Sequence, residues 1–153
     1  TGRVKDMRSM FFFASAFNQT ICNWSTVAVT TMHAMFSGCL AFNQTISTWN
    51  TVAVTDMSKL FCRASAFNQA ICTWNTVAVI AMERTFAFAS SFNQAVGTWN
   101  TAAVITMQGM FQHASVFNQA ITTWQLSNLA IMENLFSGAS GCYSEFAPVE
   151  LSK

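Results

Sequence analysis

The sequence predicts a repeat solenoid, a rod of about six stacked coils of 25 residues each. The first observation is that Phe-Asn-Gln recurs at a constant spacing of 25 residues, from 17–19 through 42–44, 67–69 and 92–94 to 117–119. A period in the twenties indicates one supersecondary unit per repeat, too small to bury its own apolar face. Stacked copies bury that face against one another.

The second observation is that large apolar residues keep the same period. One column holds tryptophan: Trp24, Trp49, Trp74, Trp99 and Trp124. Other columns hold methionine, phenylalanine, isoleucine or valine, and together these residues spread around the whole period. We therefore expect the chain to wrap around a core that the columns fill, with the tryptophans pointing inward as a structural ladder.

Two kinds of local structure are expected within each coil. Segments rich in threonine and β-branched residues, such as 46–51, favour short parallel strands. The Met-x-x-x-Phe-x-x-Ala-Ser segments space their apolar residues as a helix does, which predicts a short helix or 3-10 turn.

The predicted domain organisation is a single solenoid over residues 1–141 and a degenerate C-terminal capping segment over 142–153. Thr1 has the phase of Thr26 and Thr51, so the chain starts within a repeat and is expected to be part of a longer protein. Cys142 stands where earlier copies have the Phe of Phe-Asn-Gln, which is typical of a terminal repeat. No run approaches the roughly 18 apolar residues of a membrane span.

Charge is scarce along the whole chain. Charged residues make up 8% of the sequence and the formal net charge is +1, whereas an ordinary soluble domain has about 25% charged residues. Because no basic stripe is present, a nucleic-acid partner is not expected.

An amide column accompanies the apolar ones: Asn18, Asn43, Asn68, Asn93 and Asn118. Stacked asparagine amides can bond to one another along a rod or satisfy backbone groups where the chain turns. We interpret this column as a second structural ladder, in preference to a ligand site.

If each tryptophan points inward, the residues on either side of it point outward. They form two parallel columns that are the candidate binding face: Thr48, Asn50, Thr73, Asn75, Thr98 and Asn100. Asn23 lies outward in the Asn-Trp-Ser sequon and is the candidate glycosylation site.

Catalytic chemistry has little support in the sequence. His33 and His113 fall at different phases of the repeat, and no nucleophile, base and orienting group occur together. The five cysteines form no Cys-x-x-Cys pair. Cys39 and Cys62 lie on adjacent coils and could be bridged, but Cys39 stands in an alanine column, which favours a small buried thiol. We expect no catalytic site, no metal site and no cofactor.

The unit Val-x-x-Met-x-x-x-Phe-x-x-Ala-Ser-x-Phe-Asn-Gln-x-Ile-x-x-Trp-Asn-Thr, as in residues 54–76, resembles the BspA-type surface-protein repeat. That family is leucine-rich-repeat-like and occurs on bacterial surface lipoproteins and in secreted proteins of protists and algae. The resemblance implies a leucine-rich-repeat-like rod at the cell surface or outside the cell, used in adhesion or matrix contacts.

The expected function is therefore a non-enzymatic structural or interaction module. Its expected partners are proteins, glycans or further copies of itself in a larger complex or filament. The alternative is an ice-binding protein, because a flat and uncharged array of hydroxyl and amide groups at about 4.8 Å spacing suits an ice surface.

Overall fold

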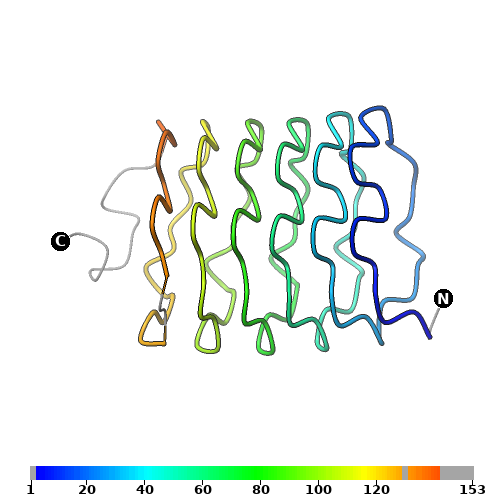
Figure 1. The fold of residues 1–153 in the computed structure, drawn as a ribbon, viewed down its shortest axis with the longest axis horizontal. Coiled ribbons are helices and arrows are strands. Elements are labelled where there is room, and N and C mark those ends of the chain that lie inside the picture. Colours follow the sequence, from blue (N-terminus) through cyan, green and yellow to red (C-terminus); the bar gives the residue numbers. More distant parts are fainter. Residues whose placement is uncertain (1–2, 129–130, 142–153) are drawn as a thin grey trace.

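The computed structural model describes residues 3–128 and 131–141 of the chain. In Figure 1 the chain winds through successive coils that lie side by side along the long axis of the molecule, from the blue coil to the orange one. We number the coils in chain order, so that coil 1 is residues 1–25, coil 2 is 26–50 and coil 3 is 51–75.

The predicted leucine-rich-repeat-like solenoid with short parallel strands and short helical or 3-10 turns is wrong. Over residues 3–128 and 131–141 the structure contains no α-helix, no 3-10 helix and no extended strand. Neighbouring coils are joined instead by isolated parallel β-bridges: Asp6 with Thr31, Thr31 with Asp56, Asp56 with Ala81, Ala81 with Thr106, and Thr106 with Ile131.

Consecutive tight turns replace the predicted helix. In coil 3 the N–H of Leu60 donates to the carbonyl of Met57 at 3.1 Å, and Lys59 within this turn has a φ of 58°. A second turn follows and contains Arg63, with a φ of 62°. A positive φ at the third residue is the mark of a type II turn. A right-handed helix needs negative φ, so the segment cannot be helical.

Hydrogen bonds between coils explain why the backbone needs no strand. The N–H groups of Met57, Lys59 and Phe61 donate to carbonyls of coil 4 at 3.0, 2.7 and 2.9 Å, whereas those of Leu60 and Cys62 close turns within coil 3. Alternate residues thus bond along the stack and within the coil. Both sets of backbone groups are satisfied although no continuous ladder forms.

The core runs along the inside of the stack and consists of the apolar columns. In one phenylalanine column the ring centroids of Phe36 and Phe61 are 5.6 Å apart, and those of Phe61 and Phe86 are 5.7 Å apart. Within coil 3, Phe61 also stacks on Phe67 at 3.8 Å. Met57 and Val54 are fully buried beside them. Coils 2 to 5 repeat these contacts, so each of them is packed by the coil on either side.

The predicted bounds of the repeat domain, 1–141, stay a prediction. The predicted capping segment, 142–153, lies outside the described residues. Among the residues that the structure describes, no helix is long and apolar enough to cross a membrane.

Candidate functional site

The candidate binding face is exposed at all six of its predicted residues. We call it the Thr/Asn face and define it by the two columns through Thr48, Asn50, Thr73, Asn75, Thr98 and Asn100. Its threonine hydroxyls are engaged with the coil before. Thr48 Oγ1 donates to the carbonyl of Cys22 at 2.8 Å, and Thr73 Oγ1 donates to the carbonyl of Ser47 at 2.9 Å. The hydroxyl hydrogens therefore hold coils together, and what each threonine offers outward is its oxygen lone pair and its methyl group.

The asparagines of the same face brace the turn that follows them. The Oδ1 of Asn50 accepts the N–H of Val52 at 3.1 Å, and Asn75 does the same with Val77 at 3.0 Å. This is an Asx turn, which fixes the side chain against its own backbone. The amide nitrogens make no hydrogen bond within the described residues, so these N–H groups are available to a partner in fixed positions.

The tryptophan column lies beneath this face and anchors it. Trp49, Trp74, Trp99 and Trp124 are 3–4% exposed, whereas Trp24 in coil 1 is half-buried. The indole Nε1–H of Trp74 donates to the carbonyl of Ile46 at 3.1 Å, and the other three buried tryptophans make the equivalent bond. Each buried indole is thus satisfied by the coil before it.

The asparagine ladder lies elsewhere on each coil. Asn18 Oδ1 accepts both the backbone N–H of Asn43, at 3.0 Å, and the Nε2–H of Gln44, at 3.1 Å. The same pair of bonds links the coils that follow, through Asn43, Asn68 and Asn93 to Asn118. These side-chain oxygens are therefore committed to bonds between coils.

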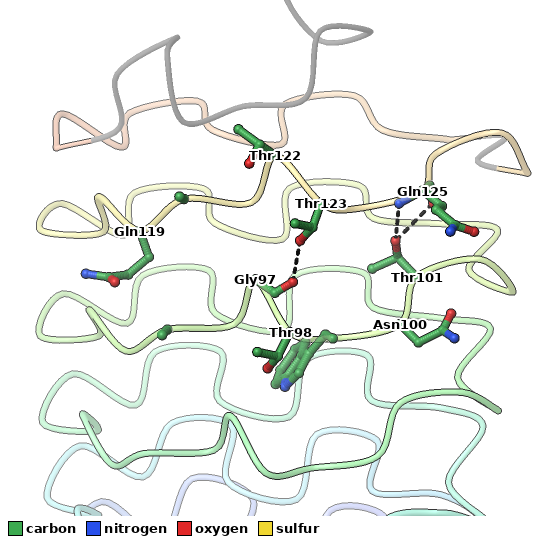
Figure 2. A pocket seen from close by; sticks show the side chains of 11 residues that line it. Gly97, Thr98, Asn100, Thr101, Gln119, Thr122, Thr123 and Gln125 are labelled. Carbon is green, nitrogen blue, oxygen red and sulfur yellow. Dashed lines mark hydrogen bonds between the residues drawn. The ribbon is translucent and has the colours of Figure 1, made fainter.

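A hollow interrupts the Thr/Asn face between coils 4 and 5, and we call it the Gly97 hollow. Its volume is about 590 Å³, and it contains the predicted Thr98 and Asn100. Figure 2 shows it with Gly97 on one coil and Thr122 and Thr123 on the next. Sequence reasoning missed this site, although one signal was present: glycine stands where coils 1, 2, 3 and 5 have cysteine, serine or threonine.

Gly97 allows the two coils to approach one another here. A Cβ at this position would lie 2.7 Å from the carbonyl oxygen of Ala120, closer than real contacts allow. The hydroxyl of Thr123 donates to the carbonyl of Gly97 at 2.5 Å (Figure 2), as Thr48, Thr73 and Thr98 do to the carbonyl at the same phase of the coil before. The side chains of Thr122 and Gln125, both exposed, make no hydrogen bond within the described residues. Both residues line the hollow, and none of the lining residues is charged.

A second hollow of about 420 Å³ lies on the same face between coils 2 and 3. Its lining includes Asn50, Thr73 and Asn75, with the indole of Trp49 beneath. The two hollows therefore lie two coils apart along the same face.

Charged groups lie outside both hollows. Arg8 pairs with Asp6 at 2.7 Å between Nη2 and Oδ2, and hydrogen bonds from Arg8 hold the pKa of the Asp6 carboxyl below its ordinary value. His33 Nδ1 lies 3.5 Å from Asp56 Oδ2. Across 3–128 and 131–141, no three His, Cys, Asp or Glu side chains gather closely enough to hold a metal ion.

The cysteines that the structure describes are free thiols, so Cys39 and Cys62 are not bridged to one another. Cys39 is fully buried, its Sγ–H donates to the carbonyl of Phe11 at 2.9 Å, and burial raises the pKa of its thiol to about 11. Cys142 lies outside the described residues. The predicted glycosylation residue Asn23 is exposed.

Comparison with known proteins identifies a family. Neither a curated protein nor a solved structure matches the chain. The family described as "Mycoplasma protein of unknown function, DUF285" matches twice, over residues 1–86 and over residues 42–147. The two matches overlap and together span nearly the whole sequence, as expected for a protein made of repeats. The chain is therefore a repeat protein that belongs to the DUF285 family of Mycoplasma proteins of unknown function.

Proposed function

We propose that the chain is a non-enzymatic interaction module that acts at the cell surface or outside the cell and contacts a protein or glycan through its Thr/Asn face. The observation that carries this proposal is the state of the hydrogen bonds on that face. Threonine hydroxyl hydrogens and asparagine oxygens are used internally, as at Thr73 and Asn75. The face is therefore held in place, while its exposed amide N–H groups make no hydrogen bond within the described residues.

Electrostatics support a neutral partner. Only 8% of the residues are charged, and none of them lines either hollow. A partner recognised here would be selected by shape and neutral hydrogen bonds, because long-range attraction of a charged ligand needs a surface of one sign. The resemblance to BspA-type repeats is the support for adhesion and for a location outside the cell.

Two alternatives differ in what they require of the face. Assembly with further copies would need this neutral surface to be self-complementary. Ice binding would need the threonine hydroxyls to be free to donate, and the hydroxyl of Thr73 already donates to Ser47. Interaction with a separate partner therefore accounts best for the surface. Thermal hysteresis at millimolar protein concentration would identify ice binding and contradict our proposal.

The test uses two matched lysine substitutions in coil 3. Thr73 and Thr55 are both exposed, and each hydroxyl donates to a backbone carbonyl of coil 2, at 2.9 and 3.2 Å. Only Thr73 belongs to the Thr/Asn face. We expect the chain to bind at least one member of a panel of immobilised extracellular-matrix proteins and glycans, measured by biolayer interferometry.

Thr73→Lys should weaken that binding at least about tenfold, because a desolvated ammonium without a partner costs more than 1.4 kcal/mol. Thr55→Lys should bind as the unchanged chain does. Absence of binding to the whole panel, or equal effects of the two substitutions, would contradict the proposal.

A further inference from the structure

We propose that the Gly97 hollow is a subsite for one ring of a neutral oligosaccharide that lies along the Thr/Asn face. This inference rests on the proposed function and names its ligand class. The volume of about 590 Å³ falls within the roughly 300–1,000 Å³ of small-molecule sites.

The chemistry of the lining matches an uncharged sugar. Hydroxyl groups both donate and accept hydrogen bonds, as do the free side chains of Gln125 and Thr122. Asn100 adds its amide N–H groups, which make no hydrogen bond to the part of the chain that the structure describes, because only its Oδ1 is used, by the N–H of Ala102 at 3.0 Å. Apolar surface comes from the exposed Ala95 and Ala120, which suits the C–H face of a pyranose ring.

The same lining disfavours a charged sugar. No lysine or arginine lines the hollow, so a uronic acid carboxylate would lose water without gaining a cation. An amino sugar in its ammonium form would likewise meet no carboxylate. An N-acetylated or unmodified hexose carries no charge, so it would not bury an unpaired carboxylate or ammonium in the hollow.

The second hollow indicates that the ligand is a chain of sugars and not a single ring. It lies on the same face two coils away, and it offers the amide nitrogens of Asn50 and Asn75. At about 4.8 Å per coil, the two hollows are on the order of 10 Å apart along the stack. Ring units of one linear oligomer can occupy both hollows at once, which raises affinity through effective concentration.

The experiment is isothermal titration calorimetry with maltotetraose, cellotetraose and chitotetraose, and with tetragalacturonate as the charged control. We compare the unchanged chain with Ala95→Leu and Ala70→Leu. Both alanines are exposed and occupy the same phase of the repeat, but only Ala95 lines the Gly97 hollow. Gln125→Leu removes a polar group from the hollow and breaks no side-chain hydrogen bond within the described residues.

We expect one of the neutral tetramers to bind and tetragalacturonate not to bind. Ala95→Leu and Gln125→Leu should each weaken binding about tenfold or more, and Ala70→Leu should stay within about twofold. Circular dichroism of each variant verifies that it is folded. No heat with any neutral tetramer at millimolar concentration, preferred binding of tetragalacturonate, or equal affinities of Ala95→Leu and the unchanged chain would overturn the inference.

The failure of this inference can be told from the failure of the proposed function. If no sugar binds but a matrix protein does, and Thr73→Lys still abolishes that contact, the face functions with a protein partner and the sugar subsite is wrong. If Thr73→Lys and Thr55→Lys act alike on every partner, the face itself is wrong and the subsite is wrong with it.

Discussion

Replacing Trp74 by alanine is the sharpest test of how the coils hold together. The indole is 3% exposed and lies between two others, with ring centroids 6.5 Å from Trp49 and 6.4 Å from Trp99. It also packs against Phe61 at 6.2 Å. Truncation removes these contacts and leaves a cavity, which costs about 3–5 kcal/mol for a buried tryptophan. The carbonyl of Ile46 loses one of its two donors and keeps the backbone N–H of Trp49.

Three companion substitutions separate the contributions. Trp74→Phe keeps a ring but removes the indole N–H, so it should cost about 0.5–1.5 kcal/mol for the lost hydrogen bond, plus a packing loss. The carbonyl of Ile46 still accepts the backbone N–H of Trp49 at 3.1 Å. Trp124→Ala should cost less than Trp74→Ala, because the indole of Trp124 packs on the ring of Phe111 at 6.1 Å and has no neighbouring indole within stacking distance among the described residues. Thr73→Ala, at an exposed position, should cost no more than about 1 kcal/mol.

Urea denaturation, followed by the fluorescence of the remaining tryptophans, ranks the variants. The free energy of unfolding should fall most for Trp74→Ala, then for Trp124→Ala, then for Thr73→Ala. If Trp74→Ala lowered the free energy of unfolding by less than about 1 kcal/mol, the tryptophan column would contribute little to the stability of the core. The arrangement of the Thr/Asn face, which depends on the indoles beneath it, would then be wrong.

Three further outcomes are expected. Gly38→Ala should lower the free energy of unfolding by about 1–2 kcal/mol, because Gly38 has a φ of +77° and an added Cβ would lie 3.0 Å from the ring of Phe13; an unchanged melting temperature would contradict this. Iodoacetamide at pH 8 should modify exposed Cys72 and spare Cys39, whose thiol stays protonated because burial raises its pKa to about 11; equal labelling by mass spectrometry would contradict it. Deglycosylation of native material should reduce the intact mass if Asn23 carries a glycan, and an unchanged mass would exclude that modification.

The period of the sequence was enough to predict stacking but not the backbone conformation. Apolar residues at Met57 and Phe61 are four positions apart, which is the spacing of a helix face, so a helix was a reasonable expectation. The actual turns require positive φ at Lys59 and Arg63. Positive φ angles are rare for residues other than glycine, and the presence of a lysine or an arginine does not predict them. The same two columns do contain Gly38, Gly109 and Gly138, all with positive φ, and these glycines were the available signal.

The prediction of short strands was wrong for a related reason. The segment 46–51 is rich in residues that favour β structure, but β propensity measures fit to a half-buried sheet and not an intrinsic backbone preference. In this fold the Thr51 hydroxyl donates to the backbone carbonyl of Asn75 at 2.9 Å, and the N–H of Trp49 turns back to Ile46. Side-chain bonds of this kind connect neighbouring coils where a strand ladder was expected.

The sequence predicted which residues of the candidate face are exposed, but not their hydrogen bonds or the hollows between them. Alternation around each tryptophan placed Thr73 and Asn75 on the outside, where the structure also has them. Whether a threonine hydroxyl donates a hydrogen bond depends on its distance from a carbonyl of another coil, such as that of Ser47. No pattern within one repeat reveals the distance between the hydroxyl and that carbonyl. The Gly97 hollow depends on how closely coils 4 and 5 approach, which is a property of two repeats together.

The bonding between coils has a consequence for the way such proteins gain and lose length. Hydrogen bonds between coils join residues 24 to 28 positions apart, so each coil depends only on its immediate neighbours. Excision of residues 51–75 would join Asn50 to Thr76 and recreate the Asn-Thr junction found at Asn75–Thr76. Gene duplication or unequal exchange in steps of one repeat would therefore lengthen or shorten the molecule by about 4.8 Å at a time, without any residue having to change in compensation.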